Sequence, residues 1–138
     1  MTRPWTRVLV CGGRDYADRE RVRMAMRRLY ERGTLVVIHG AAPGADTMAA
    51  EEWRAIIRED HARVRAASGG KRNSDLAAEG WPADWKRLGR AAGPIRNAHM
   101  ITRKPDVVIA FPGGRGTADM IARATAAGIP VVRIGDTT

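Results

Sequence analysis

The stretch VVIAFPGGRGT, residues 107–117, decides the fold class. Its first five residues are apolar, mostly β-branched and not interrupted by polar residues, which predicts a strand buried on both faces, as in a parallel sheet. A glycine-rich turn follows, and Met120, Ile121 and Ala124 then recur at helical spacing. The stretch therefore predicts a strand, a tight turn and a helix, which is the repeating unit of α/β folds.

The same pattern recurs along the chain. We expect further strands at residues 8–11, 35–38 and 130–134, and helices at 18–32, 46–57, 93–103 and 118–127. Residues 59–80 are polar and show no period, which predicts an exposed, flexible insertion with a weak edge strand at 62–66. We expect one domain over residues 1–138: a Rossmann-like, three-layer α/β domain with a mostly parallel sheet of four to five strands.

Composition points to an anionic partner. The 138 residues carry a net charge of +9, with only Lys71, Lys86 and Lys104 as lysines. A basic balance favours nucleic acid or phosphate ligands, although solvated surface charge explains it equally well, above all on the arginine-rich helix at 18–32.

No apolar run approaches the roughly 20 residues that span a bilayer, so we expect no membrane partner. Residues 1–5 lack the features of a signal peptide and the single cysteine, Cys11, fits a reducing compartment, so we expect a cytoplasmic protein. His39, His61 and His99 share no metal-ligand spacing with one another or with Cys11. We expect neither a metal site nor a cofactor.

Glycine-rich loops follow three of the predicted strands, at residues 12–15, 40–46 and 112–117. The carboxyl ends of parallel strands share one edge of a sheet, where α/β proteins bind ligands. Glycines let the backbone approach a ligand, and the positive end of the next helix attracts an anion. One such turn could need glycine for geometry alone, but three at one edge favour a ligand site. Neither a Walker-type loop nor the G-x-G-x-x-G fingerprint is present.

Further polar residues complete the candidate site. The Arg96 guanidinium suits bidentate phosphate recognition, although it could be another surface arginine. Thr117 could cap the following helix or donate to a phosphate, Asp46 is predicted to be an N-cap, and Trp85 is expected to pack on the sheet rather than stack on a base. The ligand-binding candidates are Gly12, Gly13, Arg14, Gly40, Gly44, Asp46, Arg96, Asn97, Gly113, Gly114, Arg115, Gly116 and Thr117.

The loop at 112–117, preceded by Arg-Asn-Ala-His-Met at 96–100, resembles the SLOG superfamily, which includes the Lonely Guy phosphoribohydrolases. The segments at 10–15, 40–46, 83–85 and 93–97 resemble more closely its YspA-type, cpYpsA-related family. The resemblance implies a Rossmann-like fold, often dimeric, whose glycine loops bind nucleotides or their derivatives. We therefore expect a homodimer and a small nucleotide-derived ligand.

The resemblance bears less directly on a reaction. In the phosphoribohydrolases an arginine and a glutamate act on the N-glycosidic bond of a nucleoside monophosphate, and Arg96 occupies the place of that arginine. The glutamate position is Met120, which cannot stabilise an oxocarbenium-like centre or activate water. Asp119 is adjacent but points about 100° away on the helix. Arg96 and Asp119 are the catalytic candidates, with Asp119 alternatively a simple first-turn helix acid.

These observations favour a protein that binds a nucleoside monophosphate or an ADP-ribose-like molecule as a sensor, a sequestering protein or a processing enzyme. Three alternatives stay open: an N-glycosidic phosphoribohydrolase, a basic nucleic-acid-binding protein, and an interaction module whose glycine loops are only turns. The charge and the DNA-processing SLOG protein DprA support the second alternative, and the scarcity of aromatic residues opposes it.

Overall fold

The computed structural model describes residues 4–135, and the sequence expectations for residues 1–3 lie outside this range. One parallel sheet of five strands has the order β3-β2-β1-β4-β5. The strands are β1 (Arg7–Cys11), β2 (Val36–His39), β3 (Ala77–Gly80), β4 (Val107–Ala110) and β5 (Val131–Arg133). The helices are α1 (Arg19–Glu31), α2 (Ala45–Ala67), α3 (Trp85–Leu88), α4 (Ala92–Ile101) and α5 (Arg115–Ala126), with a 3₁₀ turn, η1, at Gly89–Ala91. The predicted Rossmann-like α/β fold is confirmed.

The sheet separates two apolar cores. Alternate residues of β1 point to opposite faces, so that Val8 and Val10 pack with α1 and α2, whereas Leu9 and Cys11 pack with α4 and α5. Strands covered by helices on both faces need apolar side chains at every position. This explains the continuous apolar runs of β1 and β4.

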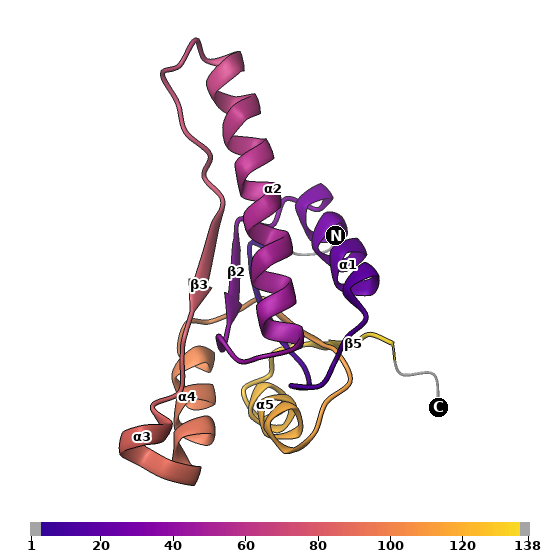
Figure 1. Cartoon of the computed structure of the whole chain (residues 1–138), viewed down its shortest axis with the longest axis vertical. Helices are drawn as coiled ribbons and strands as arrows, with labels where there is room; N and C mark the ends of the chain where they lie inside the picture. The colour runs from indigo at the N-terminus through magenta and orange to yellow at the C-terminus, as the bar shows by residue number, and fades with distance from the viewer. Residues whose placement is uncertain (1–3, 136–138) are drawn as a thin grey trace.

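The expectations for residues 59–80 are wrong in secondary structure. Residues 62–66 belong to α2, which continues to Ala67 well beyond the sheet (Figure 1), and the edge strand is Ala77–Gly80 instead. Polar contacts hold this region: Ser74 Oγ donates to Asp60 Oδ2 at 2.6 Å, and Trp53 Nε1 donates to the Ala77 carbonyl at 2.8 Å. Polar contacts of this kind do not require apolar residues at helical spacing. The second half of α2 therefore lacks the hydrophobic period from which a helix is predicted.

The strand order places the candidate site. The chain leaves β2 for β3 on one side of β1 and then crosses through α4 to β4 on the other side. The loops that follow β1 and β4 therefore diverge, and the carboxyl edge between these strands is the crevice where parallel α/β sheets bind ligands.

Candidate functional site

A cleft of about 870 Å³ opens at this edge of the sheet. The loops that follow β1, β2 and β4 line it, together with residues of α3 and α4. All the sequence-predicted ligand-binding residues except Gly44 line the cleft, and so does Asp119: they are Gly12, Gly13, Arg14, Gly40, Asp46, Arg96, Asn97, Gly113, Gly114, Arg115, Gly116 and Thr117. The fold thus brings together candidates that lie more than a hundred residues apart in sequence.

Some of the loop glycines are explained by packing alone. A Cβ on Gly12 would lie 2.5 Å from the Ala45 Cβ, and a Cβ on Gly13 would lie 2.9 Å from the Pro112 carbonyl oxygen. Gly44 has a φ of +81°, and a side chain there would strike the backbone of the β1 loop. These glycines let the three loops pack against one another, and no ligand is needed to account for them.

Gly114 and Gly116, unlike the glycines above, are not required by the packing of the loops. Both line the cleft, yet a Cβ on either would meet no heavy atom within 4 Å. Gly116 lies in the first turn of α5, where glycine costs roughly 0.5–1 kcal/mol of stability relative to alanine. The packing of the described residues therefore gives no reason for glycine at 116, and the two residues leave the start of α5 bare on its cleft side.

The predicted N-cap at Asp46 is wrong, and Thr117 is not a cap either. Asp46 and Thr117 lie inside the first turns of α2 and α5, and the N-cap residues are Gly44 and Gly114. Neither glycine has a side chain that can accept from the first helical N–H groups. The start of α5, which lines the cleft, therefore has backbone donors without a side-chain cap.

Arg96 ties α4 to the ends of two strands. Its Nη1 donates to the Gly40 carbonyl at 2.5 Å and to the Trp81 carbonyl at 3.3 Å, and its Nε donates to Asn97 Oδ1 at 3.0 Å. Burial lowers the pKa of Arg96, nearby Asp46 opposes that shift and Arg14 adds to it. Within residues 4–135 the Nη2 group makes no hydrogen bond, so the half-buried guanidinium lines the cleft held by its Nη1 and Nε groups alone.

Asp46 contributes a buried carboxyl group. Only 5% of the residue is exposed, and its Oδ2 accepts from the Gly40 backbone N–H at 2.9 Å. Burial raises the pKa of Asp46 to about 6, although Arg96 and the backbone N–H groups of Gly40 and Ala42 oppose the shift. The carboxyl group can therefore change its protonation state near neutral pH.

The catalytic candidate on α5 is already engaged. Asp119 Oδ2 accepts from Asn97 Nδ2 at 3.0 Å and from Arg123 Nε at 2.8 Å. Burial raises the pKa of Asp119, but the hydrogen bonds from Arg123 and Asn97 outweigh it and hold the pKa below its ordinary value. Met120 is buried in the core and lines the base of the cleft. The second carboxylate of the glycosidic mechanism is thus absent at 120 and held by protein partners at 119.

Trp85 and Arg90 line the cleft but were not predicted as site residues. Trp85 on α3 is 47% exposed and lies with its ring 5.5 Å from the Arg14 guanidinium, so the expectation that it packs on the sheet is wrong. Arg90, on η1, also lines the cleft. The segment between β3 and α4 has no hydrophobic period, and only the aromatic side chain of Trp85 could have signalled a role.

Two further reactive side chains, those of Cys11 and His39, are buried. Burial and nearby Asp46 raise the pKa of the Cys11 thiol to about 12, consistent with its predicted place in the core. Burial, with nearby Arg54, lowers the pKa of His39 to about 4, and its side chain does not line the cleft. In the part of the chain that the structure describes, no group of three or more His, Cys, Asp and Glu residues could hold a metal ion.

A parallel sheet with a glycine-lined cleft at its switch point is a Rossmann-like architecture. The model of the YspA, cpYpsA-related SLOG family matches residues 6–66, which run from β1 to the end of α2. The Gene 61 protein of Mycobacterium phage D29 is 37% identical over 134 residues, covering 94% of this chain and 97% of that protein. The chain belongs to the YspA, cpYpsA-related SLOG family. None of the helices described is long and apolar enough to cross a membrane.

Proposed function

We propose that this protein binds a nucleotide-derived ligand in the cleft, with a phosphate over the first turn of α5 and Arg96 as its counter-charge. The observation that carries the proposal is the bare surface at Gly114 and Gly116, which has open space above it. Backbone N–H groups and the positive end of a helix bind phosphate where no side chain blocks the approach.

The charges of the cleft support an anionic ligand. Arg90 and Arg115 line it without an ion pair or side-chain hydrogen bond to the described residues, and the Arg14 guanidinium lies over the Trp85 ring. Of the three carboxyl groups in the cleft, that of Asp119 already has its partners, that of Asp46 is buried and that of Asp15 is exposed. The cleft volume of about 870 Å³ falls within the usual range of small-molecule sites.

The ion pairs of α1 argue against this helix as a surface for nucleic acid. Arg19 pairs with Glu51 and Glu52, and Arg27 pairs with Glu59. Acidic residues of α2 therefore partly neutralise the arginine-rich surface of α1. The engaged Asp119 and the apolar Met120 favour binding without N-glycosidic cleavage. Sensing or sequestering a nucleotide is therefore the function that the site supports best.

Thermal unfolding with a panel of AMP, GMP, CMP, UMP, NAD and ADP-ribose tests the proposal. A ligand at about 100 times its Kd adds roughly 2.7 kcal/mol, which raises the Tm by several degrees in a domain of this size. Gly116→Leu fills the bare surface, and Ala126→Leu, at the exposed end of the same helix, is the matched control. Each variant is first melted without ligand to establish that it folds.

We expect a Tm shift in the wild type and in Ala126→Leu that is lost in Gly116→Leu. Arg96→Ala should also weaken binding strongly, and unchanged affinity in that variant would remove Arg96 from the site. No shift with any compound, in protein shown to be free of carried-over ligand, or a shift that survives Gly116→Leu, would contradict the proposed site.

A further inference from the structure

The helix α2 is longer than the apolar core requires. Its last buried residue is Ile56, yet the helix continues to Ala67, and the chain then returns beside it to β3. We call residues 61–74, which form the outer part of α2 and the return, the arm. Because α2 begins at the cleft, with Asp46, the arm lies at the opposite end of the molecule, beyond the sheet (Figure 1).

Polar contacts join the two sides of the arm and tie it to the rest of the fold. Arg65 Nη1 donates to Asn73 Oδ1 at 3.1 Å, and Arg63 forms an ion pair of 3.7 Å with Asp60. Fixing a segment that lies outside the core costs conformational entropy, which burial of apolar side chains does not offset here. Segments of this kind commonly carry a function of their own.

The arm is strongly basic. Residues 61–74 contain Arg63, Arg65, Lys71 and Arg72 and neither Asp nor Glu. All four cationic residues are exposed, two on the helix and two on the return. The arm therefore presents positive charge on both of its sides.

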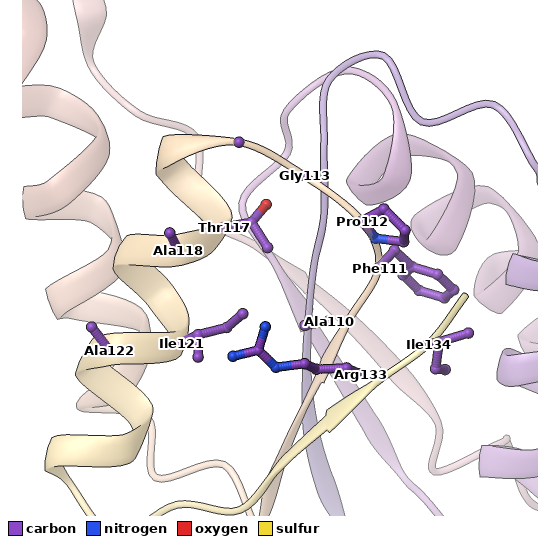
Figure 2. A pocket seen from close by; sticks show the side chains of 11 residues that line it. Ala110, Phe111, Pro112, Gly113, Thr117, Ala118, Ile121, Ala122, Arg133 and Ile134 are labelled. Atoms are coloured by element: carbon purple, nitrogen blue, oxygen red, sulfur yellow. The ribbon is translucent and has the colours of Figure 1, made fainter. Parts of the chain in front are cut away.

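Other basic parts of the chain are arranged differently. The acids of α2 that pair with α1 end at Glu59, so the pairing that weakens α1 as a surface for nucleic acid does not extend into the arm. Arg133, on β5, lies against the fold, with its side chain directed toward Ile121 of α5 (Figure 2). The cations of the arm instead project from a narrow extension that is open to solvent.

The composition of the arm restricts what can bind it. Among the described residues, the exposed large apolar side chains lie on other elements, so the arm offers none to insert into a membrane. Residues 61–74 also contain no Phe, Trp or Tyr, the side chains that dominate protein interfaces and stack on the bases of single strands. A duplex requires neither, because its phosphates lie on the outside and attract arginine and lysine directly.

We propose that the arm is a docking surface for double-stranded nucleic acid, which it binds through the phosphate backbone. Arg63 and Arg65 approach from the helix and Lys71 and Arg72 from the return, and the Asn73 amide can donate a further hydrogen bond to a phosphate oxygen. This function is separate from nucleotide binding in the cleft and does not rest on it.

Fluorescence anisotropy with labelled duplexes of DNA and of RNA, each about 30 base pairs long, tests the inference between about 50 and 200 mM salt. The variant is Lys71→Ala with Arg72→Ala, because neither side chain has an ion pair or hydrogen bond among residues 4–135. Lys86→Ala with Arg87→Ala is the matched control. It removes one lysine and one arginine from adjacent exposed positions on α3, at the other end of the molecule (Figure 1). Thermal unfolding first establishes that both double variants fold.

Each phosphate contact contributes about 0.9 to the slope of log K against log salt, so four cations predict a slope of about −3 to −4. Binding of the wild type should therefore weaken about 100-fold between about 50 and 200 mM salt, and binding of Lys71→Ala with Arg72→Ala only about tenfold. This variant should also bind more weakly at the lower salt concentration, whereas the control should keep the wild-type slope. Either duplex can satisfy the test, and the one that binds more tightly identifies the kind of nucleic acid.

Three results would overturn the inference. The first is no binding of either duplex at about 50 mM salt, and the second is an equal loss in the two double variants, which would indicate attraction to the net charge alone. The third is displacement of the duplex by AMP, which would place the duplex in the cleft. Nucleotide binding in the cleft is measured separately and can succeed or fail independently of these results.

Discussion

The side-chain amide of Asn97 donates to the carboxylate of Asp119 at 3.0 Å, and this hydrogen bond joins α4 to α5 directly beside the cleft. Arg123 donates to the same carboxylate oxygen from one turn further along α5. The two interactions give Asp119 a structural task that the sequence did not reveal. They also hold Arg96 indirectly, because Arg96 Nε donates to the carbonyl oxygen of the same Asn97 side chain.

Asp119→Asn should lower the free energy of unfolding by about 1 kcal/mol near pH 7, since it weakens a charge-assisted contact that is partly exposed. The folded pKa of Asp119 is below its ordinary value of 3.8, so its contribution is present above that pH and is lost as the pH falls through the folded pKa. Urea unfolding at several pH values should show the difference from wild type shrinking in acid. A variant with unchanged stability but abolished ligand turnover would instead make Asp119 a catalytic residue.

Gly116→Ala should stabilise the protein and weaken ligand binding at the same time. Alanine has open space at this position and favours a helix by up to about 1 kcal/mol, but its methyl group lies where the ligand phosphate is proposed to approach. Gly13→Ala is the contrasting variant, because its Cβ would lie 2.9 Å from the Pro112 carbonyl oxygen and should cost stability as well. Thermal unfolding with and without nucleotide separates the two effects. A Gly116→Ala protein that binds as tightly as wild type would argue that this glycine has no ligand role.

The sequence predicted the parts of the fold whose signal is local. The strands β1, β2 and β4 are buried on both faces, and α1, α4 and α5 each present an apolar face to the sheet, so apolar runs and helical periods mark them. The second half of α2 and the strand β3 depend instead on polar contacts between residues far apart in sequence, such as Asp60 with Ser74. No local pattern encodes such a contact.

The candidate site likewise contains residues that could be predicted from the sequence and residues that could not. The glycine loops follow directly from strands that could be predicted, and the fold brings them to one cleft. The placement of Asp46 depends on where α2 begins: the N-cap is Gly44, two residues before the expected cap, and Asp46 is instead a buried carboxyl group inside the helix. Trp85 lies on a four-residue helix that is too short to show a period.

Trp53→Phe tests how β3 is held. The Trp53 side chain is fully buried, and its indole N–H donates to the Ala77 carbonyl at the start of β3. Phenylalanine keeps most of the apolar contact but loses the hydrogen bond, so we expect a loss of about 1–2 kcal/mol and faster amide exchange in β3. Trp81→Phe, which removes a hydrogen bond to the partly exposed Glu79, should cost less. Equal effects of the two changes would argue against a special role for Trp53.

Asp46 should make stability depend on pH in the opposite direction from Asp119. Its folded pKa, about 6, exceeds the ordinary value of 3.8, so its ionisation costs stability and the cost appears as the pH rises through about 6. The shift corresponds to a cost on the order of 3 kcal/mol at most. In Asp46→Asn this cost is removed, so the variant should gain stability relative to wild type between pH 4 and 7 in denaturant unfolding. A difference between the two proteins that does not change with pH would refute the raised pKa.

Trp85 should bind the base of the ligand rather than support the fold. The side chain is 47% exposed on a helix of four residues, so Trp85→Ala should change the free energy of unfolding little. Stacking on a base contributes roughly 1–3 kcal/mol, so the variant should bind its preferred nucleoside monophosphate about tenfold or more weakly. Trp85→Phe, which keeps an aromatic face, should retain most of the affinity.

Ribose 5-phosphate separates the base from the phosphate in this test, because it carries the phosphate and sugar without a base. Ribose 5-phosphate should bind wild type and Trp85→Ala with the same affinity. The complete nucleotide should bind Trp85→Ala more weakly than it binds wild type. If Trp85→Ala weakens both ligands equally, Trp85 acts by positioning Arg14, whose guanidinium lies 5.5 Å from its ring, and not by stacking on the base.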